Sequence, residues 1–334
     1  MNNTKMILAG ALLASCSAVS NVQADNIVLT NDDGLTSNIK ALYTALKAAG
    51  HDVIVSAPCS GQSGMGAAVK YLRPITPLTQ PCLNNAAAPG APGAGPVTKT
   101  EADFDYSDFY YVEGTPVMAL AYGLDVLAQE RWGSAPDLVL SGPNEGQNVG
   151  KIVNGSGTVS NAQFAAGRGI PAIALSAGSN TAGAEDEAGN HSDNPLSVTV
   201  AELSLHLIEQ LQAKADRKSL LPEGVALNVN FPDTFSAETR WEFSRHGSYD
   251  RYDVKFVADL SQDPVAQSYG LGGVPYPGIT IGFNAEEPTR KQLKDESVVI
   301  SDGNIAVTPM QVGFDASFIE RAVTHQRLRG LLSR

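Results

Sequence analysis

The sequence is poor in positive charge. Its 334 residues include 23 Lys and Arg against 35 Asp and Glu, so the formal net charge is −12. Nucleic acid polymers and acidic membranes would repel such a chain, which argues against both as partners. A small anionic substrate is not excluded, because a bound metal ion can reverse the charge locally.

A second lack is a long apolar run. The run at residues 6–14 is preceded by Lys5 and is shorter than the roughly 20 residues that cross a bilayer. Small residues at Val22 and Ala24 then offer a cleavage site, so we interpret residues 1–24 as an export signal and the protein as periplasmic or secreted. The alternative is a lipoprotein signal at residues 13–16, which would anchor the chain through acylated Cys16.

Cysteine is also scarce, with three residues in the chain. If Cys16 leaves with the signal, Cys59 and Cys82 remain, an even number that agrees with an oxidising compartment. A disulfide between them is one hypothesis, and two separate thiols are the other.

Short apolar segments alternate with helical patterns along the chain. Strands are predicted at residues 27–30, 52–56, 110–112, 137–141 and 172–176, and helices near 37–49, 159–168, 196–213 and 316–332. Continuous apolar strands separated by helices indicate a parallel sheet that is covered on both faces. The fold class is therefore α/β, a Rossmann-like three-layer sheet with a C-terminal hairpin or extension and a terminal helix.

Three stretches interrupt this alternation. Residues 84–96 are rich in Ala, Pro and Gly and predict a solvated loop without chemistry, and residues 178–194 predict a second loop. Gly, Pro and aromatic residues without helical period indicate a hairpin arm at 247–292. We expect a main α/β domain at 25–246, this arm, and a C-terminal strand and helix at 293–334 that complete the fold.

Oxygen-rich side chains follow four of the predicted strands and loops, where open α/β sheets bind ligands. In the first segment, Asp32 and Asp33 are adjacent and would repel each other unless a cation lies between them. Such hard oxygen ligands suit Mg²⁺, Mn²⁺ or Ca²⁺ rather than zinc. The segment 31–34 is also good turn chemistry, so alone it leaves a solvated turn open.

The other three segments are loops at the same edge. Residues 56–64 can bring Ser63 beside a metal, and the glycines of residues 141–150 permit close approach of the backbone to a ligand. Residues 155–158 form a Gly-rich turn before a helix, where free N–H groups and the positive end of the dipole suit phosphate.

Three other phosphate-handling motifs are absent or out of place. Lys151 is followed by Ile152, so residues 141–152 are not a P-loop. Residues 31–33 lack the Asp-x-Asp of phosphatases that form an aspartyl-phosphate. The fragment Arg245-His246-Gly247 is used by histidine phosphatases near their N-terminus, and here it comes late, so we interpret it as non-catalytic.

Taken together, these segments resemble the SurE family of survival-protein nucleotidases. The shared motifs are NDDG, SAPxxxxSG, SGPNxGxNxG, SGTV and GIPAIALS, at residues 31–34, 56–64, 141–150, 156–159 and 169–176. The resemblance covers residues 27–176 well and the rest loosely, with Asp295, Gly303 and residues 307–309 also fitting. At residues 141–144 this chain has SGPN in place of SGIN, and in this it resembles an exported branch of the family that is similar to secreted acid phosphatases.

The resemblance implies a metal-dependent hydrolase of nucleoside 5′- or 3′-monophosphates. Its metal would be Mg²⁺ or Mn²⁺, with Ca²⁺ as the alternative, and the arm would join copies into a dimer or tetramer. The implied metal ligands are Asp32, Asp33, Ser63 and Asn144, and the implied phosphate contacts are Ser156, Gly157 and Thr158, with Asn148 as a further candidate.

Three positions depart from the family pattern. Phe164 stands where members often have Glu, Gly155 stands where a Tyr is common, and Met118 with its neighbours replaces an Asp-Cys pair. None is an implied metal ligand, so we expect the hydrolytic activity to be retained. The selectivity for nucleosides is left open by these departures.

We predict metal-assisted transfer of the phosphoryl group to water, with Asp32 and Asp33 as the catalytic residues and Asp33 accepting the proton of the water. Attack by an Asp carboxylate is an open alternative. Two other functions compete with nucleotidase: a broad acid phosphatase, and a periplasmic protein that binds nucleotides without hydrolysing them.

Overall fold

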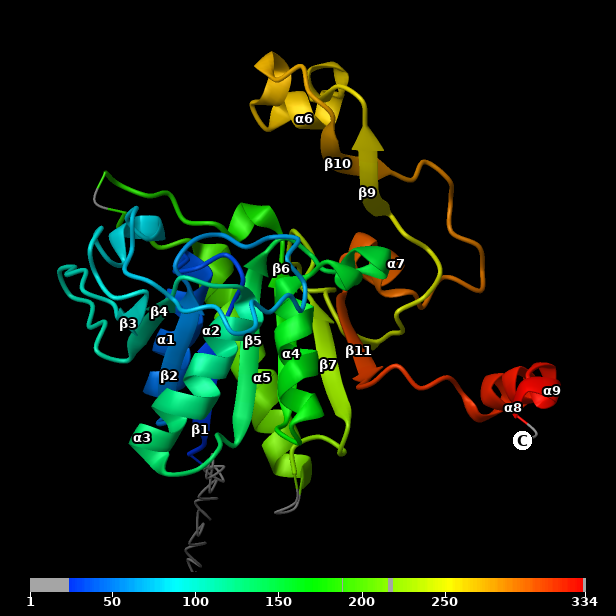
Figure 1. The fold of residues 1–334 in the computed structure, drawn as a ribbon, viewed down its shortest axis with the longest axis horizontal. Helices are drawn as coiled ribbons and strands as arrows, with labels where there is room; N and C mark the ends of the chain where they lie inside the picture. The colour runs from blue at the N-terminus through cyan, green and yellow to red at the C-terminus, as the bar shows by residue number, and fades with distance from the viewer. Residues whose placement is uncertain (1–23, 188, 216–218, 333–334) are drawn as a thin grey trace, which may run out of the picture.

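A nine-stranded sheet forms the centre of the protein in the computed structural model, which describes residues 24–187, 189–215 and 219–332 (Figure 1). The strand order is β3-β4-β2-β1-β5-β6-β7-β11-β8. The predicted export signal lies, except for Ala24, outside the described residues.

The middle of the sheet is parallel. It consists of β4 (Phe109–Val112), β2 (Asp52–Pro58), β1 (Asn26–Thr30), β5 (Leu138–Glu145), β6 (Ala172–Ala177) and β7 (Val225–Asn230). At the edges, β3 (Ala94–Pro96) pairs antiparallel with β4, and β11 (Ile305–Gln311) pairs antiparallel with β7 and parallel with β8 (Trp241–Phe243). The predicted strands are confirmed, whereas β7 and β8 went unpredicted.

Helices cover both faces of this sheet, which confirms the three-layer fold. On one face α1 (Ser37–Ala48) packs with α5 (Pro195–Ala215), and on the other α2 (Pro116–Tyr122) packs with α4 (Gly157–Gly167). The chain continues from α2 through η2 (Gly123–Leu127) into α3 (Ala128–Trp132). None of the described helices is long and apolar enough to cross a membrane.

The strand side chains divide the core into two clusters. Leu29 and Leu140 face α1 and α5, whereas their chain neighbours Val28 and Val139 face α2 and α4. All four are fully buried. Successive residues of a strand point to opposite faces, so a sheet covered on both sides requires the continuous apolar runs that the sequence shows.

A hairpin arm rises from the carboxyl-end side of the sheet (Figure 1). Its strands, β9 (Tyr252–Val257) and β10 (Gly278–Phe283), form a separate antiparallel sheet, with η5 (Leu260–Gln262), α6 (Pro264–Ser268) and η6 (Leu271–Gly273) between them. This confirms the predicted hairpin. The boundaries at 246 and 292 stay predictions.

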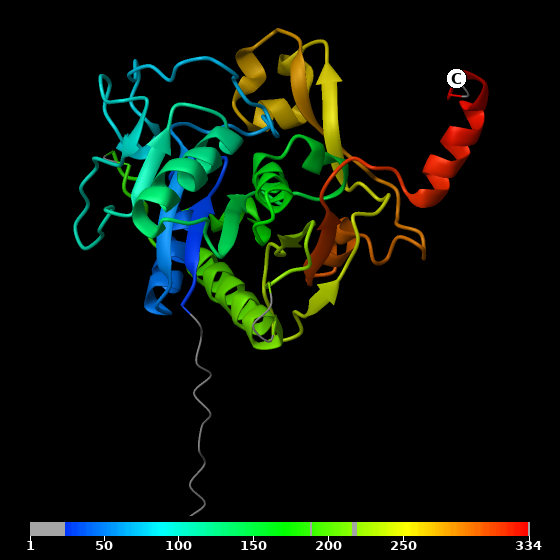
Figure 2. The ribbon, with the colours of Figure 1, turned by 60° about the horizontal axis from the view of Figure 1, so that its bottom comes forward.

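The C-terminal segment divides into a part inside the fold and a part outside it. Helix α7 (Glu296–Ser301) and strand β11 pack with the body. By contrast, α8 (Phe318–Arg327) and α9 (Arg329–Leu332) lie away from the sheet in both views (Figures 1 and 2), and the side chains of α8 are exposed.

The prediction of a solvated loop at residues 84–96 is wrong in part. Asn84, Ala86 and Ala87 are buried, and the segment ends in β3. A disulfide between Cys59 and Cys82 attaches this segment to the end of β2, and η1 (Leu83–Asn85) follows directly. Its Ala- and Pro-rich composition has no periodicity, so the burial comes from this tertiary attachment.

Replacing both Cys59 and Cys82 by Ala should lower the free energy of unfolding by about 3 kcal/mol, because the crosslink closes a loop with a sequence separation of 23. Urea unfolding of the variant and the oxidised wild type measures the difference. An identical urea midpoint for the two proteins would show that the disulfide does not stabilise the fold.

Candidate active site

The candidate site lies at the point where the strand order of the sheet reverses, beside β1. β1 is flanked by β2 on one side and β5 on the other, so the connections from these strands leave the sheet in opposite directions. Open α/β sheets bind ligands outside the carboxyl ends of the strands at such a switch point. Asp32 and Asp33 follow β1 here, and Asn144 is the second-last residue of β5.

Asp32 is held against the N-terminus of α4. It is 4% exposed, and the Thr158 hydroxyl donates a hydrogen bond of 2.8 Å to its Oδ1. Gly157 has no room for a side chain, because a Cβ there would lie 2.6 Å from the Cβ of Asp32. Burial, and then the neighbouring Asp33, raise the pKa of Asp32 to about 6.

Ser63 reaches Asp33 from the loop after β2. Its hydroxyl donates to Asp33 Oδ1 at 3.0 Å, and the amide of Gln62 donates to the Asp32 carbonyl at 2.7 Å. Two strands that are adjacent in the sheet therefore bring Ser63 to the carboxylate pair, as the sequence predicted.

Asn144 presents a buried amide oxygen that has no hydrogen-bond partner among the described residues. Its Nδ2 donates to the Gly146 carbonyl at 2.8 Å, which orients the amide. The strand is irregular just before it, with a register shift between Ser141 and Asn144. Gly142 is required there, because its φ is +112° and a Cβ would lie 2.1 Å from the Leu175 carbonyl oxygen.

The residues predicted to contact phosphate begin α4. Ser156 is the N-cap, and its hydroxyl accepts from the Val159 amide at 3.1 Å, while the Thr158 hydroxyl is engaged with Asp32. The positive end of the helix dipole is therefore what this turn offers to an anion, because the Val159 amide already bonds Ser156 and the Gly157 amide bonds Asp32.

Asn148 lies in a different polar cluster. It is buried, its amide group donates to the Ser176 hydroxyl at 2.9 Å, and its backbone N–H donates to Asn230 Oδ1 at 2.8 Å. Its carbonyl accepts from Asn228 and Asn230. These contacts fix the 146–150 loop, and phosphate contact by Asn148 stays a prediction.

Glu145 is a site residue to which the sequence reasoning assigned no role. Burial, and then the charge of Asp33, raise its pKa to about 7, and Ser37 Oγ lies 3.5 Å from its Oε1. It directly follows Asn144 in the sequence, which is the signal that could have identified it. Glu145 is therefore a third acid near this end of the sheet, with its side chain against Ser37.

Two buried acids near the C-terminus hold the base of the arm and the 146–150 loop. Glu296 is 1% exposed and accepts from the Gly150 amide and from His246 Nδ1, both at 2.9 Å. Asp295 accepts from the Arg245 side chain at 2.7 Å, and Gly247 packs so tightly that a Cβ would overlap Asp295. The Arg245-His246-Gly247 fragment thus contacts both acids at the base of the arm, and its non-catalytic interpretation stays a prediction.

The oxygen atoms at the switch point fit a hard divalent cation. They come from two carboxylates, a hydroxyl and an amide oxygen that lacks a partner, which is the ligand chemistry of Mg²⁺, Mn²⁺ or Ca²⁺. Groups of three or more His, Cys, Asp or Glu that could hold a metal do not occur in the described part of the chain. A zinc-type cluster is therefore not seen there.

Fold and site together define an open α/β protein with an oxygen-ligand, anion-accepting site at the topological switch point. The family model described as "Survival protein SurE" matches residues 27–252, so this chain belongs to the SurE family. The resemblance inferred from the sequence motifs is confirmed.

Relatives of known name agree with this assignment. The 5′-nucleotidase SurE of Thermosipho melanesiensis is 31% identical over 248 residues, which covers 73% of this chain and 78% of that protein. An acid phosphatase of Yarrowia lipolytica is 38% identical over 210 residues, or 62% of this chain and 56% of that protein. The crystal structure of the SurE protein from Aquifex aeolicus aligns with a TM-score of 0.60 and 26% identity, covering 91% of this chain and 99% of that one.

The cation-free protein should lose stability as the pH rises from about 4 to 7. The raised pKa values of Asp32 and Glu145, about 6 and about 7, mean that the native state retains protons which the unfolded chain has already released. A divalent cation should reverse this loss above pH 7, because it replaces those protons. Thermal unfolding in EDTA and in Mn²⁺ at pH 5 and 7.5 tests this, and equal Mn²⁺ shifts at both pH values would contradict it.

Proposed function

We propose that this protein hydrolyses nucleoside 5′- or 3′-monophosphates to nucleoside and phosphate with the help of a divalent metal ion. The observation that carries the proposal is the adjacent pair of buried Asp32 and partly exposed Asp33 at the end of β1, together with the unpartnered amide oxygen of Asn144 near the end of the neighbouring strand β5. Relatives named 5′-nucleotidase and acid phosphatase support phosphomonoesters as the substrate class.

The ion would be held by Asp32, Asp33, Ser63 and Asn144, with Mg²⁺ or Mn²⁺ the best fit and Ca²⁺ the alternative. When bound, it supplies positive charge that polarises the phosphate and makes a nearby water more acidic. The protein contributes rigidity, because Asp32 is fixed by Thr158 and Gln62 and so does not have to reorganise when the substrate arrives.

The N-terminus of α4 is placed to receive the phosphate. It touches Asp32 through Gly157 and Thr158, so an ester phosphate bound beside the carboxylates would also lie at the positive end of the helix dipole. Negative charge spreads over the non-bridging oxygens during transfer, and the helix dipole stabilises it.

Asp33 is the better placed of the two carboxylates to accept a proton from water. Asp32 is buried and already accepts from Thr158, whereas Asp33 is partly exposed and is contacted by Ser63. In this scheme the water oxygen forms a bond to phosphorus while the P–O ester bond breaks. The proton of the water passes to Asp33, and the leaving nucleoside oxygen takes up a proton from Asp33 or from solvent.

A broad acid phosphatase is the second candidate function. The relative from Yarrowia lipolytica carries that name. Gly155, where a Tyr is common in the family, leaves the wall beside the α4 N-terminus without a side chain, and a less enclosed pocket would accept more esters. A binding protein without turnover would not require the complete set of oxygen ligands.

Phosphate release should depend on Mg²⁺ or Mn²⁺, stop in EDTA, and be faster for AMP, GMP or 3′-AMP than for p-nitrophenyl phosphate. Equal rates on every ester would indicate the broad phosphatase, and tight nucleotide binding without release would indicate the binding protein.

Asp32→Asn should reduce turnover by more than the roughly 10–100-fold typical of losing an outer-shell partner, since it removes a direct ligand charge. The exposed Asp302→Asn variant is the matched control and should retain wild-type turnover. Retained activity in Asp32→Asn would overturn the mechanism.

We also propose that the protein is exported to the periplasm or secreted. The Cys59–Cys82 disulfide supports this, because structural disulfides persist in oxidising compartments. Processing after Ala24 or acylation at Cys16 are the two forms that the N-terminal sequence allows.

We propose further that copies associate through the arm into a dimer or tetramer. One face of β9 and β10 exposes apolar side chains, with Phe256 opposite Ile279, and these two are 70% and 60% exposed. Val254 and Phe283 extend the same exposed face. Apolar patches of this kind mark interaction sites on soluble proteins.

The double substitution Phe256→Ser and Ile279→Ser should shift the mass measured by light scattering toward the monomer, because it removes the apolar contact from the face. Lys255→Ser, on the opposite face of β9, is the control and should leave the mass unchanged. An unaltered mass in the double variant would exclude this face as the contact.

A further inference from the structure

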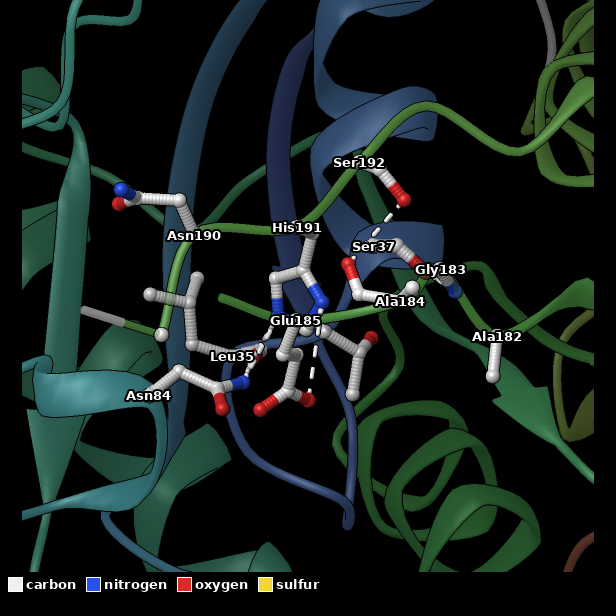
Figure 3. A network of polar contacts seen from close by, with 12 residues as sticks. Leu35, Ser37, Asn84, Ala182, Gly183, Ala184, Glu185, Asn190, His191 and Ser192 are labelled. Atoms are coloured by element: carbon white, nitrogen blue, oxygen red, sulfur yellow. Dashed lines mark hydrogen bonds and ion pairs between the residues drawn. The ribbon is translucent and has the colours of Figure 1, made fainter. Parts of the chain in front are cut away.

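Two predicted loops, one of which was expected to carry no chemistry, meet at the turn that follows the carboxylate pair. Asn84 comes from the loop after the disulfide, and His191 comes from the loop between β6 and α5. Both contact the carbonyl oxygen of Leu35, two residues after Asp33 (Figure 3).

Asn84 is the centre of this contact. Its Nδ2 donates to the Leu35 carbonyl at 2.5 Å and lies 2.7 Å from His191 Nε2. The side chain is buried, and the backbone has a φ of +56°, an uncommon conformation for a residue other than glycine. Gly189 packs on the same backbone so closely that a Cβ there would lie 2.6 Å from the Cα of Asn84.

His191 is the second side chain in this contact. Burial lowers its pKa, so the imidazole is uncharged at neutral pH. With the proton on Nδ1, Nε2 accepts from Asn84 and Nδ1 faces Glu185 Oε1 at 3.7 Å. With the proton on Nε2, the ring instead donates to the Leu35 carbonyl at 3.1 Å, so either neutral tautomer joins this contact. The Nδ2 of Asn84 therefore lies between the Leu35 carbonyl and the His191 ring, whereas its Oδ1 has no hydrogen-bond partner among the described residues.

The loop that carries Asn84 also packs against the 33–35 turn at Gly34. A Cβ at Gly34 would lie 3.1 Å from the Pro58 carbonyl oxygen and 3.4 Å from Leu83 Cδ2, so the turn is confined between the end of β2 and η1. The Leu83 amide donates to the Cys59 carbonyl at 2.7 Å, and the adjacent disulfide joins Cys59 to Cys82. The turn that carries Asp33 is therefore packed against Pro58 and Leu83 at Gly34 and is hydrogen-bonded to Asn84 at Leu35.

We propose that Asn84 is a positioning residue for Asp33, holding the 33–35 turn so that the carboxylate is preorganised for the divalent ion. The inference rests on the proposed function, because it concerns affinity for that ion. Without the Asn84 amide, the buried Leu35 carbonyl loses a donor and the turn relaxes. Supporting partners of this kind typically contribute about 10–100-fold in metal affinity.

The test is Mn²⁺ binding to the full-length protein without substrate, measured by the free-Mn²⁺ electron paramagnetic resonance signal. Asn84→Ala and Asn84→Gly should each weaken binding by about 10–100-fold. The glycine variant tolerates the positive φ, so it separates loss of the amide from backbone strain. Asn85→Ala is the matched control, because Asn85 is exposed and has a φ of +55°.

The outcomes separate this inference from the proposed function. Turnover at saturating Mn²⁺ should recover toward wild type in Asn84→Gly, since the ligands themselves are intact. Wild-type Mn²⁺ affinity in Asn84→Gly, or an equal loss in Asn85→Ala, would overturn the positioning role. Failure of the wild-type protein itself to bind Mn²⁺ would instead overturn the proposed metal-dependent hydrolysis, and the positioning role with it.

Discussion

The adjacency of the Asp32 and Asp33 carboxylates at the end of β1 is the constraint on which the rest of the site depends. Placing two like charges side by side with one of them buried raises the pKa of Asp32, and the nearby Asp33 also raises that of Glu145. A protein tolerates such an arrangement when the surrounding structure holds it and a cation can neutralise it.

The contacts that hold the two carboxylates and the neighbouring loops come from segments far apart in the sequence. The N-terminus of α4 fixes Asp32, the loop after β2 brings Ser63, and the disulfide-linked loop confines the turn through Asn84. From the C-terminal region, Glu296 secures the 146–150 loop through the Gly150 amide. Residues that touch no substrate thus occupy well-defined buried positions, as expected for supports of a preorganised site.

Much of the fold could be predicted, because buried parallel strands require continuous apolar runs and helices require their own spacing. β7 carries two Asn residues, Asn228 and Asn230, which bond to the Asn148 carbonyl, and these polar positions obscured it as a strand. The edge strand β3 was hidden in Ala- and Pro-rich sequence. Its pairing with β4 is a tertiary fact without a local signal.

By itself, the sequence determined the α/β class, the family, and the oxygen-rich residues at the strand ends, since these depend on local periodicity and on motifs of fixed spacing. Only the tertiary structure decided that burial and Asp33 raise the pKa of Glu145. It also decided that Asn84 and His191 meet at the Leu35 carbonyl. Asn84 and His191 are 107 residues apart in the chain. Contacts over such separations arise from packing, for which a single sequence carries no local pattern.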